Sequence, residues 1–123
     1  MVVDTSVLLA IFFAEEHASW AVDRLEEHAA ELRMSTVNLA ELLIRVRDRQ
    51  PQLHEEIERR VIESSIRLVA PDVQQARIAA DARGRYPLNL GDCFVYALAK
   101  AEGCGILTLD RDFRSVDCPV LIP

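Results

Sequence analysis

Short apolar segments alternate with longer segments of helical periodicity along this chain, and this alternation constrains the fold more than any other feature. The apolar segments are Met1–Val3, 32–35, 66–69, 106–109 and, as a candidate fifth, 120–122. Apolar residues dominate these segments without regular alternation, and Met1–Val3 and 120–122 are apolar at every position, which indicates strands covered on both faces. Strands separated by helices favour βαβ units. We therefore predict an α/β fold around a parallel sheet.

The segments between these strands have the spacing and caps of helices. Thr5 and Ser6 supply N-cap chemistry for a first helix through Phe13. Either Ser35 or Thr36 is expected to cap the helix that carries Glu41. Further helices are predicted over about 17–30, from Pro51, from Pro71–Asp72 to near Gly84, and from Asp92 to Gly103 or Gly105.

The composition limits the class of protein. At 123 residues the chain is expected to form a single domain, residues 1–123. The formal net charge of −6 disfavours a large, general nucleic-acid-binding surface. A local surface is still possible, because thirteen of the fourteen basic residues are Arg, which binds phosphate in a bidentate manner.

The cysteines and the apolar runs indicate a cytoplasmic location. Cys93, Cys104 and Cys118 form no C-x-x-C pair, which disfavours a zinc site or a disulfide framework and favours reduced core thiols. The longest apolar runs are far shorter than the roughly 20 residues that a membrane span needs. No secretory signal pattern is present, so no membrane partner is expected.

Four carboxylates stand in unusually apolar surroundings: Asp4, Glu41, Asp92 and Asp110. Asp4 and Asp110 each follow a predicted strand, and Asp92 begins the helix that leads to the Asp110 strand. Open parallel sheets form their sites beyond the carboxyl ends of the strands. This topology could bring all four acids together.

Clustered carboxylates need a counter-charge to remain ionised. Mg²⁺, or Mn²⁺ as a substitute, fits because hard cations prefer oxygen ligands. Such ions activate water for phosphodiester hydrolysis, either singly or as a pair about 3.5–4 Å apart. The acids therefore predict a metal-dependent hydrolytic site that needs no Ser, Cys or His nucleophile.

Each acid also has a simpler interpretation. Asp4 could only cap the next helix, Asp92 could be an N-cap, and Glu41 could pair with Arg45 at i,i+4. Asp110 and Asp112 could be turn residues. If that segment stays extended, Asp112 faces the same side as Asp110 and could replace or join it.

The motifs as a set resemble those of PIN-domain proteins. They are Val3-Asp4-Thr5-Ser6, Asn38-Leu39-Ala40-Glu41, the stretch from Gly91-Asp92 to Ala99, and the stretch from Leu107 to Phe113. They occur in the family's order and at its usual separations, across nearly the whole chain. The compact length is similar to that of the VapC toxins of VapBC toxin–antitoxin modules.

The resemblance implies a three-layer α/β/α sandwich with a central, mostly parallel sheet and a Mg²⁺-dependent endoribonuclease that cleaves structured RNA such as tRNA or rRNA. By this analogy Asp4 and Asp92 are the most direct metal ligands. Glu41 completes the site or orients a metal-bound water, and Asp110 is the more variable fourth acid. The hydroxyls of Ser6 and Thr108 are expected to support these ligands. The expected partners are a VapB-type antitoxin, a second copy in a homodimer, and a larger toxin–antitoxin complex.

Two other functions remain open. The first is a catalytically silent PIN-fold binding module, which the presence of all four acids disfavours. The second is an aspartate-dependent phosphatase or phosphotransfer domain with Asp4 as nucleophile, which the absence of a second Asp after Asp4 disfavours. If RNA is the substrate, the predicted contacts are a rim of arginines: Arg45, Arg47, Arg83, Arg85 and Arg111.

Overall fold

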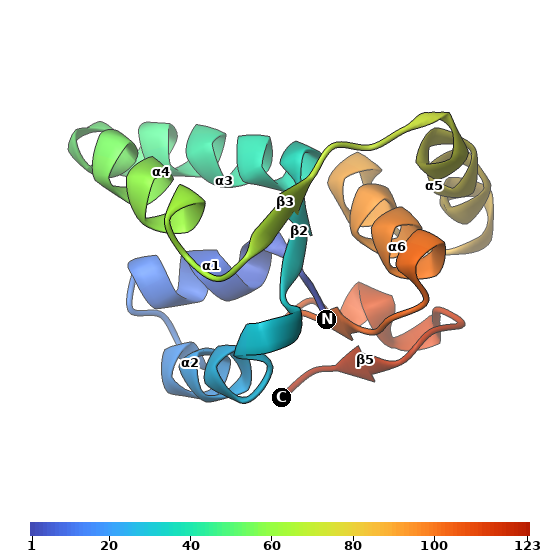
Figure 1. The fold of residues 1–123 in the computed structure, drawn as a ribbon, viewed down its shortest axis with the longest axis horizontal. Helices are drawn as coiled ribbons and strands as arrows, with labels where there is room; N and C mark the ends of the chain where they lie inside the picture. The colour runs from blue at the N-terminus through green and yellow to red at the C-terminus, as the bar shows by residue number, and fades with distance from the viewer.

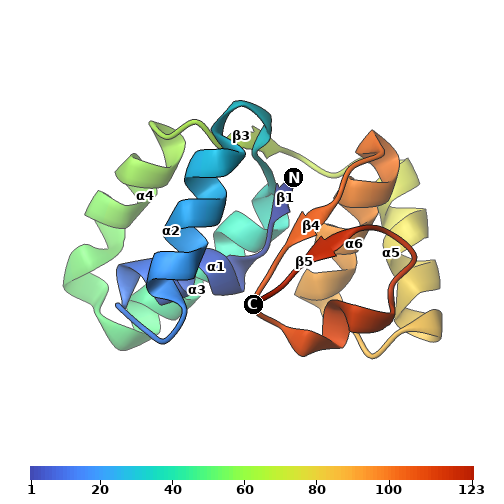
Figure 2. The ribbon, with the colours of Figure 1, turned by 90° about the horizontal axis from the view of Figure 1, so that it is seen from below.

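The computed structural model describes all 123 residues and has three layers, with a sheet between two groups of helices (Figures 1 and 2). The sheet has five strands in the order β3-β2-β1-β4-β5, and every neighbouring pair is parallel. The strands are β1 (Val2–Val3), β2 (Arg33–Ser35), β3 (Arg67–Val69), β4 (Ile106–Leu107) and β5 (Val120–Leu121). This confirms the predicted sandwich, including its fifth strand.

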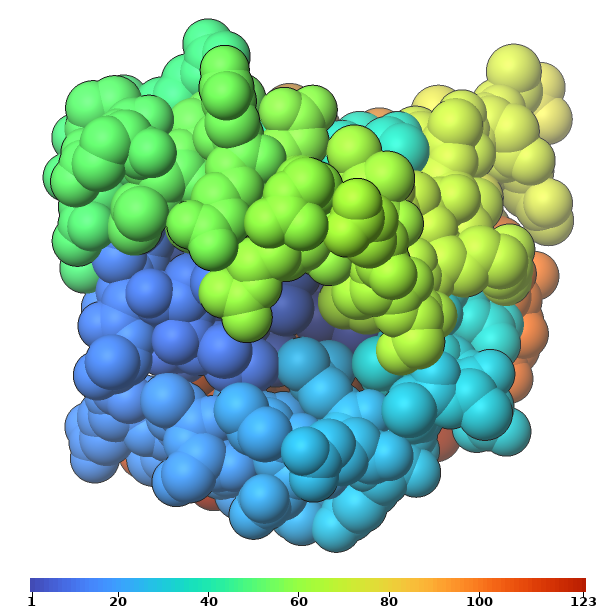
Figure 3. Space-filling view, turned by 60° about the vertical axis from the view of Figure 1, so that its left-hand side comes forward, coloured from blue at the N-terminus to red at the C-terminus, as the bar shows by residue number.

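Four helices cover one face of the sheet and two cover the other (Figure 2). The first group is α1 (Thr5–Phe12), α2 (Ala18–Glu27), α3 (Thr36–Arg49) and α4 (His54–Ile62). The second group is α5 (Val73–Arg85) and α6 (Leu90–Glu102). Short 3-10 helices complete the chain: η1 (Ala29–Glu31), η2 (Pro51–Leu53) and η3 (Arg111–Ser115). Figure 3 shows the first group from outside, where the surface is hollowed between the green α4 and the blue α1 and α2.

Each face of the sheet has its own hydrophobic core. Val3 and Leu107 contribute to the core beneath α1–α4, whereas their neighbours Val2 and Ile106 contribute to the core beneath α5 and α6. All four are fully buried. Adjacent residues of a strand point to opposite faces, so a strand that is covered on both sides can be apolar at consecutive positions. This explains the continuous apolar segments of the sequence.

The helix ends follow the expected chemistry in most places. Ser35 caps α3 by accepting from the Val37 N–H, and Asp72 caps α5 by accepting from the Gln75 N–H. Gly103 ends α6 with a left-handed φ of 63°, which costs little in glycine. None of the helices combines the length and the hydrophobicity needed to cross a bilayer.

Two cap predictions were wrong. Asp4, not Thr5 or Ser6, occupies the N-cap position of α1, and its side chain makes no cap hydrogen bond. Asn89 is the N-cap of α6, and Asp92 lies three residues inside the helix. The Asp4 side chain instead accepts from Thr108, 104 residues away, whereas Asp92 pairs locally with Asn89.

Candidate metal centre

The site lies where the connectivity of the sheet changes direction, between the neighbouring strands β1 and β4. Successive strands run outward from β1 through β2 to β3, and β4 then pairs on the other side of β1. Such a switch point leaves a crevice beyond the carboxyl ends of the two strands. Here the crevice is a cavity of about 110 Å³ lined by all four predicted acids, Asp4, Glu41, Asp92 and Asp110. Thr5, Ser6, Leu9, Arg45 and Asn89 complete its wall.

Asp4 is the most enclosed of these acids, with 3% of its surface exposed. Its Oδ2 atom accepts hydrogen bonds from Ser6 Oγ at 2.6 Å and from Thr108 Oγ1 at 2.7 Å. Burial raises the pKa of Asp4, the two hydroxyl donors oppose that increase, and the negative charges of Glu41 and Asp110 add to it. The carboxylate is therefore held in place but lacks a compensating positive charge.

The same two hydroxyls connect α1 to the segment after β4. Ser6 Oγ accepts from the backbone N–H of Leu109 at 3.0 Å, and Thr108 Oγ1 accepts from that of Asp110 at 2.9 Å. Each hydroxyl thus donates to Asp4 and accepts from the Asp110 segment. This geometry matches the supporting role expected for Ser6 and Thr108, and it fixes Asp110 relative to Asp4.

Glu41 is held by neutral donors and makes no ion pair with Arg45. Its Oε1 atom accepts from Thr5 Oγ1 and from Asn38 Nδ2, each at 2.9 Å. Asn38 is fully buried, and its Nδ2 also donates to the carbonyl of Gly91 at 3.0 Å. Asn38 therefore joins α3 to the start of α6 and orients Glu41 toward the cavity.

Gly91 permits the close approach of Glu41 to α6, because a Cβ at this position would overlap the Glu41 carboxylate. We expect Gly91→Ala to displace Glu41, weaken divalent-cation binding and lower the melting temperature. Gly84→Ala is the matched control, since Gly84 is also helical and a Cβ there meets nothing within 4 Å. That variant should gain up to about 1 kcal/mol of stability from helix propensity. Calorimetric melting and cation titration of both variants test this, and equal effects would contradict it.

Asp92 is fixed by a reciprocal capping box at the start of α6. Its backbone N–H donates to Asn89 Oδ1 at 2.8 Å, and its Oδ2 accepts from the Asn89 N–H at 3.2 Å. Only 6% of the residue is exposed. Burial, followed by the charge of Asp4, raises the pKa of Asp92 to about 7, despite the opposing hydrogen bond from Asn89. Capping thus positions the carboxylate without relieving its electrostatic cost.

The segment after β4 turns rather than remaining extended. Asp110 is the N-cap of η3 and accepts from the Asp112 N–H at 2.9 Å. The premise that Asp112 faces the same side through extension was therefore wrong. The 3-10 turn nevertheless keeps both acids near Asp92, because one carboxylate oxygen from each of the three residues lies within 4.8 Å of the other two. Asp112 is exposed, whereas Asp110 is half-buried and lines the cavity.

The donor set fits a hard divalent cation. Carboxylate oxygens dominate the cavity, and no thiol or imidazole lines it. Arg45 is the only basic side chain in its wall. Of the other arginines expected near RNA, Arg83 donates to the Leu88 carbonyl, and Arg85 is engaged by Asp81, Tyr86 and Asp117.

Three polar residues of the site had no role assigned from the sequence. Thr5 was expected only to cap a helix, Asn38 was only part of a motif, and Asn89 lay outside the predicted helix that begins at Asp92. The i,i+3 spacing of Asn38 with Glu41, and of Asn89 with Asp92, was a usable signal, since such pairs are neighbours on a helix or form a capping box. No local signal indicated that Thr5 would reach Glu41.

Comparison with known proteins decides the family. The model of the PIN domain family matches residues 1–118. The chain belongs to the PIN-domain family. A VapC ribonuclease of Mycobacterium bovis and ribonuclease VapC42 of Mycobacterium tuberculosis are each 36% identical to it over 127 residues, covering 95% of both chains. A VapC ribonuclease of Mycolicibacterium smegmatis is 35% identical, with 95% of this PIN domain and 96% of the relative covered.

Solved structures share the PIN fold at lower identity. VapC20 of Mycobacterium tuberculosis, described as a Sarcin-Ricin loop cleaving toxin, matches with a TM-score of 0.82 and 16% identity over 99% of this chain and 98% of that one. A toxin–antitoxin complex from Klebsiella pneumoniae matches with a TM-score of 0.78 and 21% identity, covering 98% of this chain and 94% of that one. VapBC2 of Rickettsia felis, bound to a promoter DNA fragment, gives a TM-score of 0.78 at 15% identity, covering 98% of this chain and 96% of that one.

Proposed function

We propose that this PIN-domain protein is a Mg²⁺-dependent endoribonuclease and the toxin of a type II toxin–antitoxin module. The observation that carries the proposal is the convergence of Asp4, Glu41, Asp92 and Asp110 on one small cavity. Relatives at 35–36% identity that span nearly the whole chain and are named VapC ribonucleases support it. Mn²⁺ is expected to substitute for Mg²⁺, since both accept carboxylate and water ligands.

The proposed metal ligands are Asp4, Glu41, Asp92 and Asp110, with Asp112 close enough to take part. When bound, Mg²⁺ would supply an activated water and would neutralise charge at the scissile phosphodiester. The protein holds the acids still: Ser6 and Thr108 fix Asp4, Thr5 and Asn38 fix Glu41, and Asn89 fixes Asp92. Pre-positioned ligands need no rearrangement as the reaction proceeds.

Arg45 is proposed to contact the RNA backbone beside this centre. It lines the cavity, is exposed, and makes no ion pair with the protein's own acids. Its guanidinium can therefore bind a phosphate oxygen at the edge of the acidic centre. With a net charge of −6, the protein would depend on such local contacts and on the bound cation to hold RNA.

The substrate is proposed to be structured RNA, such as tRNA or rRNA, recognised by shape and unstacked bases. The cleaving toxin of known structure supports this class by its fold alone, because its sequence identity is 16%. A small antitoxin partner and a homodimeric toxin within a larger complex are proposed on similar grounds, since several structures of the same fold are toxin–antitoxin complexes.

The decisive experiment incubates the purified protein with total tRNA and rRNA, with Mg²⁺, with Mn²⁺, or with a chelator. We expect discrete cleavage products with either cation and none with the chelator, and sequencing of the new ends identifies the site. Binding of RNA without cleavage in any cation would favour the catalytically silent module. Trapping of an aspartyl-phosphate at Asp4 would favour the phosphotransfer function.

A further inference from the structure

Two cysteines lie at matching positions just before neighbouring strands, Cys104 before β4 and Cys118 before β5. The parallel register pairs Ile106 of β4 with Val120 of β5. Two residues earlier, the same register places Cys104 opposite Cys118. The pairing extends nearly to both cysteines, because the Ile106 N–H donates to the carbonyl of Pro119 at 2.9 Å. Adjacent strands lie about 4.8 Å apart, within the range of about 4.4–6.8 Å for Cα atoms joined by a disulfide.

Both side chains are on the same side of the sheet and within reach of solvent. Cys104 and Cys118 pack against the core formed with α5 and α6, as do Ile106 and Val120 in the same register. Both are half-buried and line one cavity of about 480 Å³. Cys93, in contrast, is 1% exposed and lies elsewhere in that core. All three cysteines are free, but only Cys93 is fully buried in the core, whereas Cys104 and Cys118 are half-buried at its edge.

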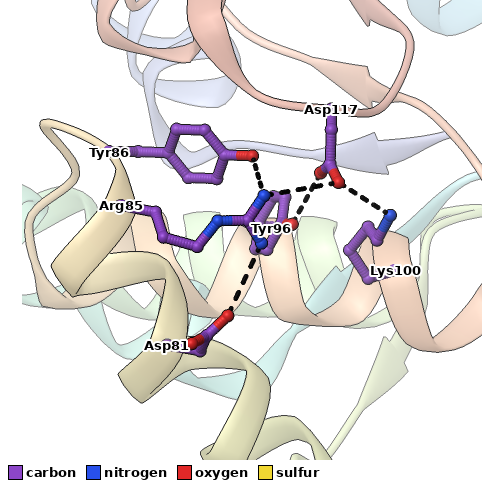
Figure 4. Close-up of polar contacts among 6 residues, drawn as sticks. All are labelled: Asp81, Arg85, Tyr86, Tyr96, Lys100 and Asp117. Atoms are coloured by element: carbon purple, nitrogen blue, oxygen red, sulfur yellow. Dashed lines mark hydrogen bonds and ion pairs between the residues drawn. The ribbon is translucent and has the colours of Figure 1, made fainter.

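The residue before Cys118, Asp117, is held by polar side chains of α5 and α6 (Figure 4). Asp117 Oδ1 accepts from Tyr96 Oη at 2.6 Å, and its Oδ2 lies 3.4 Å from Lys100 Nζ and 3.7 Å from Arg85 Nη2. These contacts hold the segment before β5 against α5 and α6, and they restrict the position of the adjacent Cys118. Because Asp117 is held in place, less conformational entropy is lost when the sulfur of Cys118 approaches that of Cys104.

The charges around the cavity act on thiol reactivity in both directions. Burial raises the pKa of the Cys118 thiol, as does negative charge on Asp117, whereas Lys100 lowers it. A thiolate at Cys104 also raises the pKa of Cys118, which is consistent with the two thiols being near neighbours. Lys100 lines the same cavity, and its positive charge favours a thiolate at Cys118.

We propose that Cys104 and Cys118 form a reversible intrachain disulfide when the protein meets a peroxide. One thiol loses its proton, and its thiolate attacks a peroxide oxygen; the O–O bond breaks to give a sulfenic acid and a hydroxide, which takes up that proton to become water. The second thiol then displaces the sulfenic oxygen as a second water while the S–S bond forms. Overall, two thiols and one hydrogen peroxide give one disulfide and two waters; sulfur loses two electrons and the peroxide gains them. A dithiol reductant returns both cysteines to thiols by exchange and is itself oxidised to a disulfide.

The bridge would enclose the segment that carries two acids of the metal centre. Asp110 and Asp112 lie between the two cysteines, in the connection from β4 through η3 to β5. Closing this loop removes conformational freedom from the unfolded chain and fastens the edge strand β5 to β4. The oxidised protein should therefore melt at a higher temperature than the reduced protein, whether or not it cleaves RNA.

The test treats the folded, metal-free protein with a modest excess of hydrogen peroxide, then denatures it and alkylates the remaining thiols. We expect the free thiols to fall from three to one, with no covalent dimer and with Cys104 and Cys118 joined in a single peptide pair by mass spectrometry. Cys104→Ser and Cys118→Ser should each abolish the bridge, whereas Cys93→Ala should retain it. The melting temperature should rise by several degrees only where the bridge forms, and should return to its original value with dithiothreitol.

Three results would overturn the proposal: retention of all three thiols, a bridge that includes Cys93, or disulfide-linked dimers as the main product. A bridge that forms and lowers the melting temperature would show that the native register does not accommodate it, which also contradicts the geometry. These readouts do not depend on ribonuclease activity, so their failure is distinguishable from failure of the proposed function.

Discussion

Asp4→Asn is expected to lower the rate of metal-dependent RNA cleavage by about 1,000-fold. The substitution keeps an oxygen that can accept from Ser6 and Thr108, so the local hydrogen bonds at 2.6 and 2.7 Å can persist. What it removes is the charge that would bind the cation. Metal catalysis contributes several kcal/mol of transition-state stabilisation, and a loss of about 4 kcal/mol corresponds to this fold-change. Single-turnover cleavage of a structured RNA at saturating Mg²⁺ measures it.

Asp23→Asn is the matched control for this prediction. Asp23 lies on α2, is exposed, and does not line the acidic cavity. The Asp23→Asn variant carries the same change in net charge as Asp4→Asn and should cleave RNA at the wild-type rate. A large loss in both variants would point to the overall charge, and full activity of Asp4→Asn would exclude Asp4 as a metal ligand.

The metal-free protein should lose stability as the pH rises from about 4 to about 7, and Asp92→Asn should remove much of that loss. The pKa of Asp92 is raised from 3.8 to about 7 in the folded state, first by burial and then by the charge of Asp4. Between these two values the folded state binds more protons than the unfolded state. The free energy of unfolding therefore decreases with increasing pH in this window.

The size of this loss of stability follows from the increase in the pKa of Asp92. Each pKa unit corresponds to about 1.4 kcal/mol, so Asp92 could account for roughly 2–4 kcal/mol after allowance for coupling to Asp4. A difference of that size is on the order of 10 °C in melting temperature for a chain of this length.

The difference between the two melting curves isolates Asp92, because groups such as Asp117, whose lowered pKa acts in the opposite direction, are common to both proteins. We expect Asp92→Asn to melt above the metal-free wild type at pH 8 and close to it at pH 4. Saturating Mg²⁺ should stabilise the wild type more than the variant, since binding to the folded state adds stability. A variant less stable than the wild type at pH 8 without metal would show that Asp92 serves mainly as a cap.

The four acids could be found from sequence because each interrupts an apolar segment, where an uncompensated carboxylate is costly. Their supporting residues were harder to find, since Thr5, Asn38 and Asn89 are ordinary helix-start residues. The alternatives for the acids were decided by contacts between distant segments. Glu41 accepts from Thr5, which is 36 residues away, and makes no ion pair with Arg45. Asp92 is a partner in the capping box whose N-cap is Asn89.

The sequence by itself determined the α/β architecture and the parallel arrangement, because short, largely apolar segments alternate with helical ones and neighbouring parallel strands need long connections such as helices. It also showed which carboxylates lie within apolar segments. Only the tertiary structure decided how they are used. Packing brings the ends of β1 and β4 and the start of α6 to one cavity, and it brings Cys104 beside Cys118. Such neighbours depend on strand order and register, which are properties of the whole folded chain.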